Sequence, residues 1–382
     1  MKDTVFHQLL VPLSDNLIQE CIKRFRSDYY YETMNTQTHL KAMIYAQINE
    51  SKSLRLLETT INSQNIGIEV KIKRSTLSDA NAKRNADCFF WLLDQLMSLL
   101  PRTIRKEVKK VVKLLDSSPI KLRGRGYDEW AEEVSTRHWQ GIKLHVEYDL
   151  ELGAPTTIKT SFANFNDSSM GQRWVINKDT IYVFDKGYCD FNWWWSIDQK
   201  NAFFVTRLKK NTAILMQSEE KISSETILED GTFVLKNKNP RGGKKNYYTE
   251  PLRRISVFRE GKKPLILVTN IKDLSPEVIA NLYKSRWDIE LFFKWIKQNL
   301  KLKKFLGKSA NAVKIQMATA LITYILLFIF KSNSNDKRTL QLITAYVRVN
   351  LTRRKCYLRV TSPPVYYFPL RPLISKGRAV YL

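Results

Sequence analysis

Two aspartates, Asp116 and Asp185, follow short apolar runs and are therefore expected at the ends of strands. An acid at a strand end projects from a rigid element into the crevice at the edge of a sheet. Carboxylate oxygens are the hard ligands that Mg²⁺ prefers, and two or three are enough because Mg²⁺ keeps several waters. Asp after a strand is also ordinary turn chemistry. Each aspartate alone therefore leaves both a metal site and a plain turn open.

A more specific pattern of polar residues lies in the last third of the chain. Its members are Tyr283, Arg286, Glu290 and Lys297. On one continuous helix from Ser275, at about 100° per residue, the four side chains fall within about 60° of one another. An apolar stripe beside them is expected to face the core. The pattern predicts a helix with a row of functional groups, although a solvated ladder of charge pairs fits the same spacing.

These residues need a sheet and helices to hold them, and the hydrophobic pattern predicts both. Six apolar or alternating runs are expected to be strands, at residues 111–116, 141–150, 156–162, 180–184, 202–207 and 264–269. Residues 208–263 are polar, basic and strand-like, with glycine turns. The helix with the polar row and a second, apolar helix follow. Strands followed by helices predict an α/β or α+β body.

The net charge is strongly positive and unevenly spread. The 382 residues include 63 Lys and Arg against 37 Asp and Glu, a formal net charge of +26. Residues 1–98 contain 12 basic and 11 acidic residues, a net of +1, whereas residues 331–382 contain 11 basic residues and one acid, a net of +10. A polyanionic partner is implied, of which nucleic acid is the commonest and an anionic membrane surface the alternative.

The N-terminal part is expected to be helical. Residues 38–49 and 53–62 have apolar residues at helical spacing, and Ser75 is the expected cap of a third helix flanked by basic residues. Two helices, a turn and a basic-flanked third helix suit a helix-turn-helix DNA reader. A small helical bundle with a solvated basic edge fits the same pattern, so both interpretations stay open.

Composition excludes several classes of protein. With 43% hydrophobic and 12% aromatic residues, the chain is not a disordered one. Its four cysteines and four histidines lack the spacing of a disulfide framework or a zinc site. The uncharged run 315–330 is shorter than the roughly 20 residues of a spanning helix, so a buried core helix is expected. No signal peptide is predicted.

The polar row resembles the Y-(2)-R-(3)-E-(6)-K signature of bacterial insertion-sequence transposases of the DDE class, a group that includes cut-and-paste enzymes. Asp116 in LDSS, Asp185 in FDKGY and Glu290 in the signature resemble the family's three acids, in the same order. The triplet KLH at residues 143–145 matches a strand motif common there. Arg207 in FFVTR resembles an arginine that follows the second aspartate by one strand.

The resemblance covers roughly residues 105–330 and implies an α/β fold: an RNase H-like catalytic core with an inserted β-rich subdomain and a helical N-terminal domain. The expected domains are a helical DNA-binding domain at 1–104, a catalytic domain at 105–330 with its β-rich insertion at 208–263, and a basic C-terminal region at 331–382.

The resemblance further implies a Mg²⁺-dependent DNA transposase, which is both an endonuclease and a strand transferase. Asp116, Asp185 and Glu290 are expected to be the catalytic residues and to hold two Mg²⁺ ions, for which Mn²⁺ can substitute. The expected DNA-binding residues are Tyr283, Arg286, Lys297, Arg207, Lys294 and Trp287. Such an enzyme binds the terminal inverted repeats of its element, cleaves the ends and joins them to target DNA.

The implied partners are transposon ends, target DNA and a second copy of the chain in a dimeric synaptic complex. No membrane and no small-molecule substrate are expected, and the implied location is the bacterial cytoplasm, at the nucleoid. The alternative is a catalytically inactive basic DNA-binding or repressor protein, which needs the charge but not the acids. Two smaller questions stay open. The run WWW at residues 193–195 suits base stacking or packing, and His145 is expected as a strand residue rather than a general base.

Overall fold

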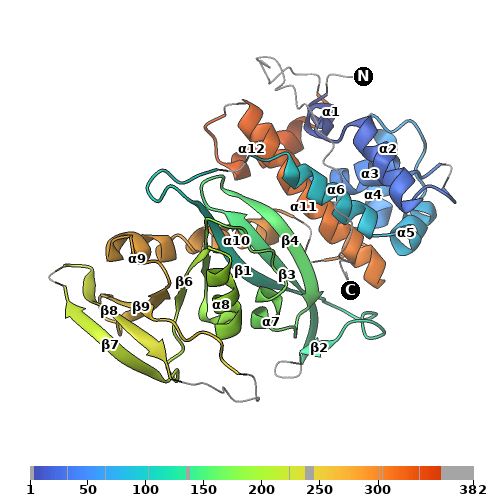
Figure 1. The fold of residues 1–382 in the computed structure, drawn as a ribbon. Coiled ribbons are helices and arrows are strands. Elements are labelled where there is room, and N and C mark those ends of the chain that lie inside the picture. Colours follow the sequence, from blue (N-terminus) through green and yellow to red (C-terminus); the bar gives the residue numbers. More distant parts are fainter. Residues whose placement is uncertain are drawn as a thin grey trace.

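The computed structural model describes residues 4–353 except positions 32, 65, 102, 135–137, 223, 237–244, 301, 303 and 335. Within this part of the chain, a helical N-terminal unit packs beside a body built on one large sheet (Figure 1). Most of the predicted basic C-terminal region, residues 354–382, lies outside the described residues.

The N-terminal unit contains six helices: α1 (Val5–Leu10), α2 (Asp15–Phe25), α3 (Thr36–Ile48), α4 (Leu54–Ser63), α5 (Arg74–Lys83) and α6 (Asp87–Ser98). The two predicted helices are α3 and α4, and the side chains of Asn35 and Ser53 cap their first turns. The predicted cap at Ser75 is wrong, because α5 already begins at Arg74. The start of α5 is set from outside the helix, since the Asn62 amide binds both the N–H and the C=O of Ile72 at 2.9 and 2.8 Å.

The predicted apolar helix is α11 (Ala310–Ser334), and it is a core helix as expected. By length and composition it could cross a membrane, but most of its apolar stretch is buried inside the protein. On one side it packs against α3, α5 and α6, and the Asn311 amide donates to the carbonyls of Asn81 and Arg84. On the other side its Tyr324 ring contacts Phe292 of the body at 5.0 Å between centroids. The N-terminal unit is thereby anchored to the body, and α12 (Leu340–Asn350) packs on α11 nearby.

Among the described residues ten strands form one mixed sheet: β1 (Val111–Lys121), β2 (Glu133–Val134), β3 (Trp139–Asp149), β4 (Ala154–Phe162), β5 (Thr180–Phe184), β6 (Phe203–Arg207), β7 (Ile214–Lys221), β8 (Ile227–Leu235), β9 (Leu252–Val257) and β10 (Leu265–Thr269). Their order is β2-β3-β1-β5-β6-β10-β9-β8-β7, and β4 pairs with β3 off this path. The β1–β5 and β5–β6 pairs are parallel, and the other pairs are antiparallel. Each of the six predicted strands is present, which confirms the α/β class.

The two faces of the central strands belong to different clusters of buried side chains, because successive residues of a strand point to opposite faces. Leu114 and Val183 share one cluster with residues of α10 (Trp287–Asn299) and α11. Leu115 and Phe184 share the other with α7 (Asp167–Gly171) and α8 (Phe191–Gln199). Trp193 and Trp194 are buried in this second cluster, so packing accounts for both of them.

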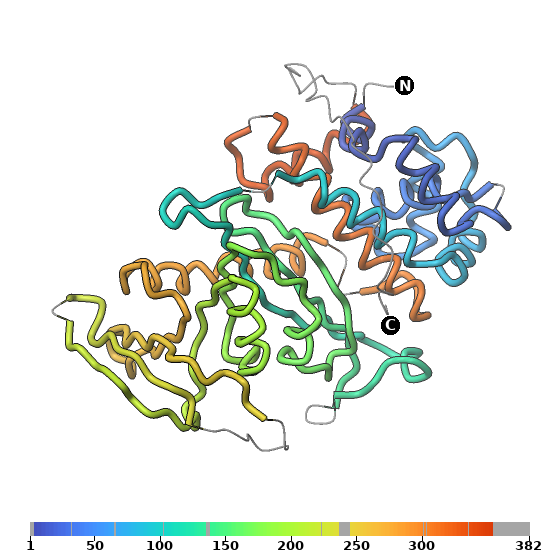
Figure 2. Tube along the Cα trace, in the orientation of Figure 1, coloured from blue at the N-terminus to red at the C-terminus, as the bar shows by residue number. Residues whose placement is uncertain are grey.

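The segment predicted to be β-rich contains β7, β8 and β9, which continue the central sheet outward from β10. Figures 1 and 2 show these strands, in yellow, at the end of the molecule opposite the N-terminal helices. Within them Arg253 binds Asp230 on the neighbouring strand and donates to the carbonyl of Leu274 at 2.6 Å. This contact ties the insertion to the residue just before the capped start of α9 (Pro276–Lys284).

Candidate active site

Asp116 and Asp185 lie side by side at the parallel pair in the centre of the sheet. The register of β1 and β5 pairs Leu115 with Phe184, so the two aspartates follow at the same level of neighbouring strands. Asp116 Oδ1 accepts a hydrogen bond from the main-chain N–H of Ser117 at 2.8 Å. The Asp185 carboxylate caps a short 3₁₀ turn by accepting from the N–H of Gly187. Asp185 follows the end of β5 as predicted, whereas the prediction that Asp116 ends its strand is wrong, because β1 continues to Lys121 in its pairing with β3. The register of β1 and β5 brings the two aspartates together.

The helix predicted to run continuously from Ser275 is in fact two helices, and this part of the prediction is wrong. Ser275 caps α9, which ends at Lys284, and α10 begins only at Trp287. Between them the N–H of Arg286 donates to the carbonyl of Tyr283, three residues back, and the Ser285 hydroxyl donates to the carbonyl of Asn281. The i−3 bond of Arg286 tightens the helical turn and changes the direction of the chain.

Arg286, at the junction of the two helices, connects two of the three predicted acids. Its guanidinium lies 3.4 Å from Asp116 Oδ2 and 2.6 Å from Glu290 Oε1. The Arg286 side chain is only 15% exposed. The two contacts bring Glu290, on the first turn of α10, to the middle of β1, where Asp116 lies beside Asp185. The three acids, which are far apart in the chain, therefore gather at one place.

The electrostatics of Asp116 reflect this crowding. Burial raises the pKa of Asp116 to about 7, and the negative charges of Asp185 and Glu290 add to the rise. The Ser117 N–H and the Arg286 guanidinium act in the opposite direction. The raised pKa therefore reflects mainly the removal of the Asp116 carboxyl group from water, and the two neighbouring acids make a smaller contribution.

The donor chemistry of the three acids fits a hard divalent cation, because all three offer carboxylate oxygens. Within the described residues, however, no three acidic, histidine or cysteine side chains already surround a common point. The reason is visible in the contacts, since Arg286 lies between Asp116 and Glu290. Binding of a cation by all three acids therefore requires the guanidinium to leave at least one of them.

Tyr283 and Lys297 also lie near Arg286 and the middle of β1. The Tyr283 side chain is buried, its hydroxyl has no hydrogen-bond partner among the described residues, and its ring lies 5.9 Å from the Arg286 guanidinium. Burial raises its pKa, and the charges of both Arg286 and Arg207 oppose that rise. Lys297 Nζ lies 2.6 Å from Ser118 Oγ, two residues beyond Asp116. The polar row therefore survives the break between the helices.

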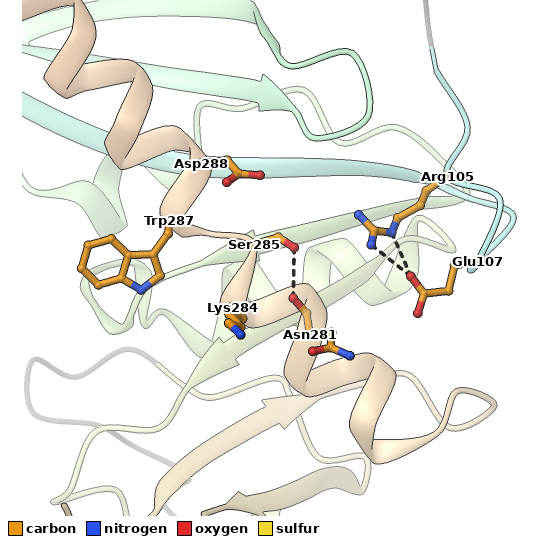
Figure 3. Close-up of a pocket in the computed structure, with 7 residues that line it drawn as sticks. All are labelled: Arg105, Glu107, Asn281, Lys284, Ser285, Trp287 and Asp288. Atoms are coloured by element: carbon orange, nitrogen blue, oxygen red, sulfur yellow. Dashed lines mark hydrogen bonds and ion pairs between the residues drawn. The ribbon is translucent and has the colours of Figure 1, made fainter. Parts of the chain in front are cut away.

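Trp287 and Lys294 are exposed residues of α10. Trp287 is 60% exposed, and Lys294 is exposed on the same helix. Trp287 lines an open surface pocket of about 560 Å³. Figure 3 shows the pocket, whose other lining residues are Arg105, Glu107, Asn281, Lys284, Ser285 and Asp288. None of the three acids contributes to it, so Trp287 belongs to an adjoining surface.

The structure also brings in residues that the sequence analysis missed. Ser118 contacts Lys297, and Asp167 accepts a hydrogen bond from Ser117 at 2.6 Å. In the sequence, the pair of serines directly after Asp116 could have indicated that Ser117 and Ser118 belong to the site. Asp167 had no such signal, because its partners come from other strands. His145 is a fully buried strand residue, as expected, and burial lowers its pKa to about 3.

Comparison with known proteins places this geometry in context. The family described as Transposase DDE domain matches residues 107–326, and a domain of unknown function matches residues 1–66. Over 308 residues the chain is 36% identical to a putative transposase of Sinorhizobium fredii, covering 78% of this chain and 83% of that protein. Over 326 residues it is 25% identical to a putative insertion-sequence transposase of Synechocystis, covering 82% and 86%.

Among solved structures, the chain resembles the piggyBac transposase in a synaptic complex with hairpin DNA. The TM-score is 0.53 at 8% sequence identity, and the likeness covers 91% of this chain and 80% of that one. At this identity the likeness concerns the fold alone.

Proposed function

This chain belongs to the transposase DDE domain family of bacterial insertion-sequence enzymes, and we propose that it binds the terminal inverted repeats of its element, cleaves the ends and joins them to target DNA. The fold supports an RNase H-like catalytic core, because the mixed α/β sheet and its resemblance to a solved transposase agree.

The observation that carries the proposal is the convergence of three acids from distant parts of the chain. Asp116 lies within β1 and Asp185 directly follows the neighbouring parallel strand β5, and Glu290 shares Arg286 with Asp116. We assign these acids as the catalytic residues and as the ligands of two Mg²⁺ ions, for which Mn²⁺ can substitute. When bound, the ions supply two-metal phosphoryl transfer, which stabilises both the attacking and the leaving oxygen.

The chain's own basic groups hold the DNA beside these acids. Arg286 is the strongest candidate, because a guanidinium binds phosphate through two parallel hydrogen bonds and a phosphate competes with the carboxylates it now contacts. Lys297 and Arg207 add positive charge around the same end of the sheet, and Lys294 extends it along α10. The Tyr283 hydroxyl, which lacks a partner among the described residues, is free to donate to phosphate.

Trp287 provides a second kind of contact. Its ring is exposed beside Lys284 and Arg105, which suits a base stacked on the indole with its phosphate near a cation. Stacking on an exposed ring requires a base that has left the helix, and DNA at a cleaved end supplies one.

The N-terminal unit is proposed to contact the same DNA through α5, which exposes Lys73, Arg74 and Lys83. The α4–α5 connection runs over residues 64–73 and is longer than the three- or four-residue turn of a simple helix-turn-helix. The unit is therefore an elaborated reader or a helical bundle with a basic edge. Two ends must meet for transposition, so a homodimeric synaptic complex at the bacterial nucleoid completes the proposal.

A cleavage assay with labelled terminal-repeat DNA tests this function. We expect Asp116→Asn, Asp185→Asn and Glu290→Gln each to bind the ends but not to cleave them in Mg²⁺ or Mn²⁺. Asp128→Asn is the matched control, because Asp128 is an exposed acid between β1 and β2. An acid variant that cleaves at the wild-type rate removes that acid from the site. A wild type that binds ends but never nicks them favours the alternative, an inactive DNA-binding or repressor protein.

A further inference from the structure

A second polar cluster lies on the face of the sheet opposite Arg286, directly behind Asp116. Asp116 contacts Arg286 at the start of α10, whereas the next residue, Ser117, points to the other face and contacts α7. The register of β1 and β3 pairs Ser117 with His145, and Lys143 lies two residues away on the same face. The cluster therefore consists of Ser117, Lys143, His145 and Asp167.

Asp167 is the centre of this cluster. Its Oδ1 accepts a 2.6 Å hydrogen bond from Ser117 Oγ and lies 3.3 Å from Lys143 Nζ and 3.7 Å from His145 Nδ1. Lys143 is held in turn by a 2.6 Å bond to the carbonyl of Phe165. His145 is fully buried and its Nε2 lies 2.8 Å from Ser161 Oγ, which fixes the ring from β4. One oxygen of Asp167 therefore connects α7 with both β1 and β3.

The other oxygen of Asp167 faces the second aspartate. A Cβ added to Gly187 would lie 3.5 Å from Asp167 Oδ2 and 2.7 Å from Asp185 Oδ1. Beside it the Tyr188 hydroxyl is buried and has no hydrogen-bond partner in the described part of the chain. Burial raises the pKa of Tyr188, and the charges of Asp167, Asp116 and Asp185 add to the rise. The buried phenol of Tyr188 therefore lies close enough to all three aspartates for their charges to act on it.

The sheet explains why β1 needs this contact. The parallel ladder between β1 and β5 ends at the pair of Leu115 with Phe184. From Asp116 onward β1 keeps its partner β3 on one side but has no strand on the other. The Ser117–Asp167 hydrogen bond holds β1 at the point where the neighbouring strand β5 has ended. Because Ser117 N–H also binds Asp116 Oδ1, any displacement of Ser117 displaces the carboxylate.

We propose that Asp167 is a positioning residue of the catalytic site: held by Lys143, it acts through Ser117 to fix the orientation of Asp116. This inference rests on the proposed function and assigns a role to the KLH triplet. Asp167 need not touch the DNA or a cation to act in this way. Misplacement of a reacting group by about 1 Å costs up to about 100-fold in rate, which sets the size of the expected effect.

The test compares Ser117→Ala, Asp167→Ala and the double variant in single-turnover cleavage of a labelled end. Each single variant is expected to cleave about 10- to 100-fold more slowly. The double variant is expected to be no slower than the worse single one, because both changes remove the same link. Asp167→Asn keeps an oxygen for the Ser117 hydroxyl, so it should retain more of the rate than Asp167→Ala. Asp128→Asn serves again as the control.

Three further measurements separate positioning from loss of fold and from failure of the proposed function. End binding in gel shifts and the melting temperature should stay near wild type, while the Mn²⁺ concentration that half-maximally raises the melting temperature should increase. Additive losses in the double variant, or wild-type cleavage by Asp167→Ala, would overturn the positioning role alone. A wild type that neither cleaves ends nor responds to Mn²⁺ would overturn the proposed function, and this inference with it.

Discussion

Replacing Arg286 with glutamine should destabilise the protein in a way that depends on both pH and divalent cations. The change removes a contact to the largely buried Asp116 at 3.4 Å and an i,i+4 pair with Glu290 at 2.6 Å. Hydrogen bonds to charged groups contribute about 1.5 to 3 kcal/mol, and an i,i+4 ion pair about 0.3 to 0.5 kcal/mol. We therefore expect a loss of about 2 to 3 kcal/mol in the free energy of unfolding without divalent cations.

The sign of the pH dependence follows from Asp116. Its pKa is about 7 with Arg286 opposing the rise, so loss of the guanidinium moves the pKa higher. A carboxyl group whose folded pKa is raised above its unfolded value loses stability as the pH rises through the folded pKa. The part of the deficit that comes from Asp116 should therefore be small at pH 6 and fully present near pH 8.5.

Urea unfolding at these two pH values, in EDTA and in Mn²⁺, measures the effect. Mn²⁺ should raise the unfolding midpoint of the variant more than that of the wild type, because the cation takes over the charge compensation that Arg286 provided. Arg105→Gln is the matched control, since Arg105 forms an exposed pair with Glu107 that is worth at most about 1 kcal/mol. Equal stability of Arg286→Gln and wild type in EDTA at pH 8.5 would refute the reasoning.

Three other predictions follow from single contacts. Gly187→Ala places a Cβ 2.7 Å from Asp185 Oδ1, so the carboxylate must move. Cleavage of the ends should fall by about 100-fold while DNA binding in gel shifts persists, and unchanged cleavage would contradict this. Burial, aided by the charge of Arg84, lowers the pKa of His39 to about 3, so below about pH 6.5 the unfolded state binds a proton that the folded state does not. The free energy of unfolding should therefore be at its full value above about pH 6.5 and fall by up to about 1.4 kcal/mol per pH unit below it. His39→Gln should show a flatter dependence of stability on pH. Lys297→Met removes one cation beside Ser118, so end binding should weaken for any sequence and the salt slope should drop by about one, which filter binding at several salt concentrations measures.

The sequence indicated the candidate acids more directly than the DNA-binding surface. The apolar runs before Asp116 and Asp185 are visible in the local pattern, although β1 continues past Asp116 and only Asp185 follows the end of its strand. The basic residues number 63, and their pattern predicts a polyanionic partner without indicating which of them touch it. Trp287, predicted together with Arg286, lines a separate pocket that none of the three acids enters, and no local pattern indicated this pocket.

By itself the sequence determined the order and identity of the candidate acids, the six central strands and the buried apolar helix. These features depend on the local spacing of apolar residues, which can be read without knowing which elements pack against the strand or helix. The turn that ends α9 was not visible in this way, because Ser285 and Arg286 keep helical backbone angles and the i−3 hydrogen bond of Arg286 marks the change.

Only the tertiary structure decided which groups meet. The register of β1 and β5 puts Asp116 beside Asp185, the helix junction brings Arg286 between two acids, and Asp167 reaches Ser117 from fifty residues away. A local pattern reports which face of its own element a residue occupies. The distance between two elements is set by strand register and side-chain packing, and these depend on contacts between residues that are remote in the chain.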